Sequence, residues 1–233
     1  MKVKKESKGK RPMRKSLYSL MLDDGVVAAI DRLAYLQSTT RSGLVNRILA
    51  EYASYITPEQ RIREAFGSMR LLLDREGEIR LLSEPSDTML SLRSALLYKY
   101  NPTVRYSVEL YRTEEGDAGE LRVSLRTQNE ALIAAMMRFY RIWDSVERTR
   151  LQAPPDCRAS AGKYLRVLTP CNRYTASTAQ LTPNALGELI VGYIRTLDHA
   201  LKLYFRHLED TEAAIAAVEA VYTEYIRSSE ILL

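Results

Sequence analysis

The chain has 233 residues, of which 46% are hydrophobic and 27% are charged, proportions typical of a soluble globular protein. No uncharged apolar stretch approaches the length of about 18 residues that a membrane-spanning helix needs, so the composition excludes a membrane span. The net charge of +5 is unevenly distributed, because residues 1–15 hold eight basic residues and one acidic residue while the rest of the chain holds 26 basic and 28 acidic residues.

Residues 1–15 are predicted to form a flexible basic arm. A dense group of cations attracts phosphates, so the arm indicates a nucleic-acid partner, and a solubilising tail is the alternative interpretation. The arm residues expected to bind DNA phosphates are Lys10, Arg11, Arg14 and Lys15.

Residues 16–22 alternate in a way that predicts a strand. One face of this strand carries Tyr18, Leu20 and Leu22, and the other carries Leu17, Ser19 and Met21. No second strand pattern lies nearby in the sequence, and a lone strand leaves its backbone groups unpaired. We therefore expect two copies of the chain to pair their strands antiparallel.

Two amphipathic helices are predicted after the strand, over residues 24–37 and 40–55. Each is about four turns long, which is marginally stable in water without packing partners. Pooling four helices from two copies beneath the paired strands would bury both apolar stripes.

This order of elements resembles the ribbon-helix-helix family, which includes the Arc and MetJ repressors, over residues 14–55. The strand, the acidic start Asp23-Asp24 and the second-helix start Thr40-Arg41-Ser42 carry the resemblance. It implies an obligate homodimer whose two-stranded ribbon enters the DNA major groove, with Leu17, Ser19 and Met21 facing the bases. Thr40, Arg41 and Ser42 are expected to hold a phosphate at the free N–H groups of the helix start. Ser38 occupies the inter-helix turn, where this family often has Gly.

The remaining residues, 57–233, are predicted to form a mainly helical domain that contains a β-hairpin. Thr57, Pro58 and Gln60 predict a helix start, followed by helices over residues 58–75 and 86–100. Further helices are expected over residues 128–150, from Thr182 onwards, and over residues 210–228. The overall fold class expected is therefore α+β and mostly α.

Residues 103–127 show strict alternation on both sides of a polar loop and predict the hairpin, with residues 164–168 as a candidate third strand. Arg105, Arg122 and Arg126 lie on the polar face of this hairpin. A second phosphate-binding surface and simple solvated cations are both open interpretations of these arginines.

Catalytic patterns find little support in the sequence. His199 and His207 are more than two helical turns apart, and Cys157 and Cys171 lack the spacing of a zinc site. We expect two free thiols in a reducing cytoplasm, no metal, no cofactor and no enzymatic activity.

Together these patterns predict a cytoplasmic, dimeric regulator, such as a repressor, that binds double-stranded DNA, as the resemblance implies for a prokaryote or a mobile element. The domain at residues 57–233 would then serve oligomerisation or sensing of a small effector. One alternative is an antitoxin or a plasmid-maintenance or transfer accessory protein whose carboxyl-terminal domain binds a protein partner. In another, Leu17 and Met21 indicate that the ribbon serves only for assembly.

Overall fold

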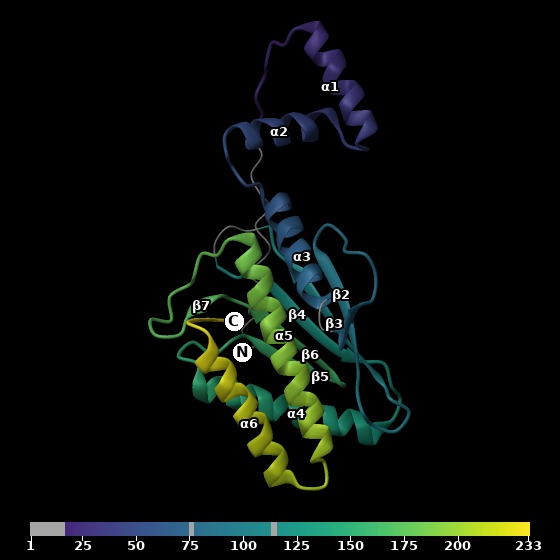
Figure 1. Cartoon of the computed structure of the whole chain (residues 1–233), viewed down its shortest axis with the longest axis vertical. Helices are drawn as coiled ribbons and strands as arrows, with labels where there is room; N and C mark the ends of the chain where they lie inside the picture. Colours follow the sequence, from purple (N-terminus) through teal and green to yellow (C-terminus); the bar gives the residue numbers. More distant parts are fainter. Residues whose placement is uncertain (1–16, 75–76, 113–115) are drawn as a thin grey trace, which may run out of the picture. The chain divides into compact units, whose positions relative to one another are not determined.

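The computed structural model describes residues 17–74, 77–112 and 116–233. The chain divides into two compact units, Met1–Arg61 and Ile62–Leu233, here called the amino-terminal unit and the carboxyl-terminal unit (Figure 1). Within the described part of the chain, no helix is both long and apolar enough to cross a membrane.

The amino-terminal unit contains two helices, α1 (Asp24–Leu36) and α2 (Arg41–Tyr52), where the sequence predicts them. α2 ends earlier than residue 55 because Ser54 has φ +52°, a left-handed conformation that stops a helix. The third helix, α3 (Pro58–Asp74), begins as predicted, with the Thr57 hydroxyl accepting a hydrogen bond from the Gln60 N–H at 3.2 Å.

A six-stranded antiparallel sheet, in the order β1-β2-β3-β4-β6-β5, forms the base of the carboxyl-terminal unit. Its strands are β1 (Ile79–Leu81), β2 (Met89–Ala95), β3 (Thr103–Leu110), β4 (Gly119–Leu125), β5 (Cys157–Ser160) and β6 (Lys163–Leu168). The predicted hairpin and third strand are confirmed as β3, β4 and β6. A Cβ at Gly119 would collide with the Glu109 carbonyl oxygen, so this strand start requires glycine.

The helix predicted over residues 86–100 is wrong, because the segment forms β2. Leu90, Leu92 and Ser94 are buried while Arg93 and Ala95 are exposed, an alternation with a period of two. Apolar residues at neighbouring positions also fit one face of a short helix, and pairing with β3 decides between the two structures. The carboxyl-terminal unit is therefore α+β with a full sheet rather than mainly helical with one hairpin.

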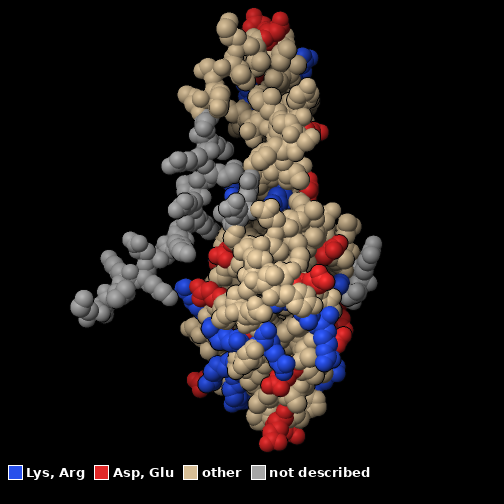
Figure 2. Space-filling view, turned by 90° about the vertical axis from the view of Figure 1, so that its left-hand side faces the viewer, with Lys and Arg blue, Asp and Glu red and all other residues tan. Residues whose placement is uncertain are grey.

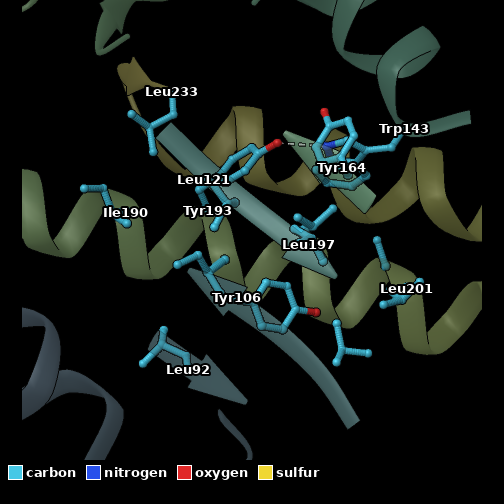
Figure 3. Packing of buried hydrophobic residues seen from close by; sticks show 14 of the residues in the cluster. Leu92, Tyr106, Leu121, Trp143, Tyr164, Ile190, Tyr193, Leu197, Leu201 and Leu233 are labelled. Atoms are coloured by element: carbon cyan, nitrogen blue, oxygen red, sulfur yellow. Dashed lines mark hydrogen bonds between the residues drawn. The ribbon is translucent and has the colours of Figure 1, made fainter. Parts of the chain in front are cut away.

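Three further helices confirm the remaining predictions, namely α4 (Glu130–Arg150), α5 (Pro183–Arg206) and α6 (Thr211–Ser228). Buried side chains of α3, α4 and α5 form one continuous core with one face of the sheet, and Figure 3 shows part of this core. α6 packs against α4 through Tyr222, whose ring lies edge-on to Trp143 at 5.1 Å, and against α5 through Tyr225, whose ring lies edge-on to Tyr193 at 5.9 Å. A short second sheet pairs β7 (Cys171–Asn172) with β8 (Ile231–Leu232) near the carboxyl end.

Several polar groups within this core are paired with one another, although the Tyr140 and Tyr222 hydroxyls and Arg166 Nη2 have no hydrogen-bond partner among the described residues. Trp143 donates from Nε1 to the Tyr193 hydroxyl at 2.9 Å, as the dashed line in Figure 3 shows. The Glu147 carboxylate accepts from Arg166 Nε at 3.0 Å and from the Tyr193 hydroxyl at 3.0 Å, with both charged side chains fully buried. These contacts join α4, α5 and β6, so the core fixes how the helices lie on the sheet.

Candidate nucleic-acid interface

The turn between α1 and α2 is built by local hydrogen bonds. Asp23 caps α1, with its carboxylate accepting from the Gly25 N–H at 2.8 Å. Ser38 has φ +49°, a left-handed conformation that Gly adopts most easily, and the Thr39 N–H then donates to the Ala34 carbonyl at 2.9 Å. This turn brings the start of α2 close to α1.

Thr40 caps the second helix as the sequence predicts. Its backbone is extended and its hydroxyl accepts from the Gly43 N–H at 3.1 Å. The N–H groups of Arg41 and Ser42 have no acceptor among the described residues, as expected at the first turn of a helix. The two free donors and the helix dipole together favour an anion at this exposed end.

Arg41 is not a free cation, because it forms a bidentate ion pair with Asp31 of α1. Its Nε donates to Asp31 Oδ1 at 2.5 Å, and its Nη2 donates to Asp31 Oδ2. The hydrogen bond from Arg41 lowers the pKa of the Asp31 carboxyl. The pair holds the guanidinium at the helix start, and a phosphate there would compete with Asp31. Asp31 is a participant that the sequence analysis missed, because the turn at Ser38 has to align the two helices before Asp31 meets Arg41.

Residues 17–23 precede α1 and are neither helix nor paired strand in a single chain. Leu17 and Met21, on the predicted base-facing side, are fully exposed, while Tyr18, Leu20 and Leu22 on the other side are 82%, 59% and 45% exposed. Ser19 is exposed as well. All residues from 17 to 22 are exposed in the single chain, so the two faces and the strand pairing stay predictions. The arm residues Lys10, Arg11, Arg14 and Lys15 lie outside the described residues.

The two helices of the amino-terminal unit leave most of their apolar side chains in solvent. Ala34, Leu44 and Ala50 are buried. Val26, Leu33, Leu36, Ile48, Leu49 and Tyr52 are exposed. Figure 2 shows that the viewed face of this unit is largely uncharged, whereas the viewed face of the carboxyl-terminal unit carries many basic and acidic side chains. An exposed apolar surface of this kind marks a contact with another molecule.

The two cysteines and Asp198 are chemically versatile groups of the carboxyl-terminal unit. Cys157 and Cys171 are free thiols, and burial raises the pKa of Cys157 to about 12, which keeps its sulfur protonated at neutral pH. Asp198 is buried and held by Tyr106 at 2.8 Å, Ser94 at 3.1 Å and Lys202 at 2.7 Å. Within the described ranges, no three His, Cys, Asp or Glu side chains are grouped to hold a metal ion.

Comparison of the chain with protein-family models, with curated proteins and with solved structures gave no match.

Proposed function

We propose that the protein binds duplex DNA as a homodimer through its amino-terminal unit and acts as a transcriptional regulator. The observation that carries this proposal is the combination of two capped helices with exposed apolar stripes and a preceding segment with no strand partner among the described residues of its own chain. A second copy would bury both stripes and pair residues 17–22 across the two-fold axis.

In this dimer the paired segments enter the major groove, and the starts of the two α2 helices hold phosphates. Ser19 supplies the hydroxyl for base edges, while Leu17 and Met21 contact thymine methyl groups. The basic arms add electrostatic attraction that does not depend on sequence. The carboxyl-terminal unit, with its own closed core, serves oligomerisation or sensing.

A pair of salt titrations on the full chain tests the proposal, using a duplex enriched from a random pool and an unrelated duplex. The two arms of a dimer hold sixteen cations. If about half meet phosphates, the logarithm of affinity falls against the logarithm of salt with a slope near about −7. Deleting residues 1–13 removes six cations per arm and should reduce this slope steeply while preserving most of the sequence preference.

Replacing Ser19 and Met21 together by Ala should do the reverse, flattening the preference between the duplexes with little change in slope. If the double variant keeps full discrimination and the arm deletion abolishes it, the ribbon does not read the bases.

The exposed Leu17 and Met21 favour one second candidate, in which the ribbon serves assembly only. Equal affinity of the wild-type dimer for all duplexes, or no binding to any of them, would support this candidate.

A further inference from the structure

The outward face of the six-stranded sheet carries a row of cations that the amino-terminal unit does not account for. The strand register places Arg80 opposite Arg93 and Arg93 opposite Arg105, and the same row continues through Ser124 to Lys163. All four basic side chains are exposed. Arg80, Arg93, Arg105 and Lys163 are here called the cation row.

Strand alternation fixes the direction in which the row points. Leu92 and Ser94 flank Arg93 and are buried, as are Val104 and Tyr106, which flank Arg105. The core side of the sheet is occupied by these residues and by the helices, so the arginines project from the opposite face. The sequence analysis could not find this row, because it placed Arg93 in a helix predicted over residues 86–100 and not in a strand of the sheet.

The row is electrostatically unfavourable on its own. Side chains directly opposite each other on neighbouring strands have Cβ atoms about 5 Å apart, and like charges at such positions destabilise a sheet. Arg93 and Arg105 have no acidic partner among the described residues. The acids of this face, Glu109 and Glu120, bind Arg122 instead. A ligand with several regularly spaced negative charges would relieve the repulsion.

The neighbouring side chains suit phosphodiester groups. Ser91 and Ser107 lie beside the row with their hydroxyls 3.4 Å apart. Arginine forks and hydroxyls are common donors to phosphate oxygens. The outward strand positions hold no aromatic residue in the described sheet, so stacking of unpaired bases has no platform there. These features favour a duplex, whose bases are already paired, over a single strand.

The length of the row also fits a polymer. From β1 to β6 the row crosses four inter-strand steps of about 4.8 Å, or about 19 Å in total. Along a DNA duplex one strand places a phosphate about every 3.4 Å of the axis, so several phosphates fall within that length.

We propose that the cation row binds the phosphodiester backbone of duplex DNA without reading its bases. The inference rests on the proposed function in one respect: a duplex held by the amino-terminal unit raises the local DNA concentration at a second surface of the same chain.

The test is a salt titration of the full chain with Arg93→Gln and Arg105→Gln together, on a random duplex. The slope of the logarithm of affinity against the logarithm of salt should become shallower by about 1.8 if one protomer of a dimer uses its row, and by about 3.6 if both protomers do. Arg158→Gln is the matched control, because Arg158 is an exposed cation of the same sheet that already pairs with Asp156 at 3.3 Å, and its slope should stay unchanged. The unfolding temperature of the double variant should not fall, since the change removes a repulsion.

The outcomes separate this inference from the proposed function. Wild-type binding with an unchanged slope in the double variant overturns the cation row and leaves the amino-terminal site intact. Binding that survives deletion of residues 1–13 and then requires Arg93 and Arg105 supports the row independently of the arm. Absence of wild-type binding to any duplex overturns both. Loss of binding to phosphatidylserine vesicles in the double variant, with the DNA slope unchanged, assigns the face to an anionic membrane and also overturns the inference.

Discussion

The two units of this protein differ in what they do with their apolar side chains. In the carboxyl-terminal unit the apolar faces of the sheet and of four helices form one continuous core. In the amino-terminal unit two helices of similar amphipathic pattern bury Ala34, Leu44 and Ala50 and expose larger side chains such as Leu33 and Leu49. An apolar stripe on a helix thus predicts that the helix packs against an apolar partner. In the carboxyl-terminal unit this partner belongs to the same chain. In the amino-terminal unit, as we propose, it belongs to a second copy of the chain.

The largest expected effect concerns the self-contained core. Glu147→Ala should lower the free energy of unfolding of the carboxyl-terminal unit by about 3–5 kcal/mol, because it leaves Arg166 charged and unpaired in a fully buried position. Trp143 is the only tryptophan of the chain and is fully buried in this unit, so its fluorescence during urea unfolding measures this unit selectively.

A control replaces both members of the pair, Glu147→Leu with Arg166→Met. This double variant should lose less stability than Glu147→Ala, since no unpaired charge remains. Equal losses would mean that the ion pair contributes little and that packing alone explains the effect.

The second prediction concerns the amino-terminal unit, whose apolar side chains are exposed. Leu20→Glu should weaken dimerisation at least about 100-fold, about 3 kcal/mol, because the dimer would have to bury an unpaired carboxylate. Sedimentation of the full chain at micromolar concentration measures the change from dimer to monomer, and Trp143 fluorescence should show an unaltered carboxyl-terminal unit.

Leu71→Glu provides the matched control, because Leu71 is an exposed leucine on α3 that we place outside the dimer contact. A wild-type chain that sediments as a monomer at this concentration would remove the basis for the ribbon-helix-helix assignment.

A comparison of two threonine caps gives a smaller effect. Thr40 accepts from the Gly43 N–H at 3.1 Å in one unit, and Thr182 accepts from the Ala185 N–H at 3.3 Å in the other. Either substitution by Ala should cost about 1 kcal/mol of stability. Thr40→Ala should also weaken binding to every duplex, whereas Thr182→Ala should leave DNA affinity unchanged. The same loss of affinity in both variants would show that the cap of α2 has no specific role at the phosphate.

The smallest effect is pH dependence in the amino-terminal unit. Arg41 lowers the pKa of Asp31 below its unfolded value, so the pair stabilises the folded unit above about pH 4 and this contribution is lost as the pH falls through the folded pKa. Asp31→Asn should remove that part of the acid sensitivity, measured as the difference between the two chains in dimer formation from pH 5 downward. An identical acid profile would mean that the exposed pair adds no stability.

The structure confirms those sequence predictions that depend on strong local signals. Thr57 with Pro58 and Thr182 begin their helices where the sequence predicts a start, and the hairpin of β3 and β4 follows from strict alternation. The prediction of a helix over residues 86–100 is wrong, because over a short length the apolar residues of this segment fit both the helical period of 3.6 and the strand period of two. The strand β5 has exposed residues at three of its four positions, so no hydrophobic pattern marks it.

For the candidate interface, the sequence predicted a helix start at Thr40, Arg41 and Ser42, which is where α2 begins. It did not supply the partner of Arg41, since a bidentate pair with Asp31 depends on how the turn at Ser38 aligns the two helices. The cation row was inaccessible for a similar reason. Its members come from β1, β2, β3 and β6, and only their register puts them side by side.

The sequence by itself determined the helix starts, the turn at Ser38, the hairpin and the concentration of positive charge in residues 1–15, because each depends on residues close together in the chain. The tertiary structure decided that residues 89–95 are a strand, that Glu147 meets Arg166 inside the core, and that Arg80, Arg93 and Arg105 form a row. The physical reason is that backbone pairing and burial act between segments far apart in sequence. Where a short sequence pattern is compatible with both a helix and a strand, the segment against which it packs or pairs decides which structure forms.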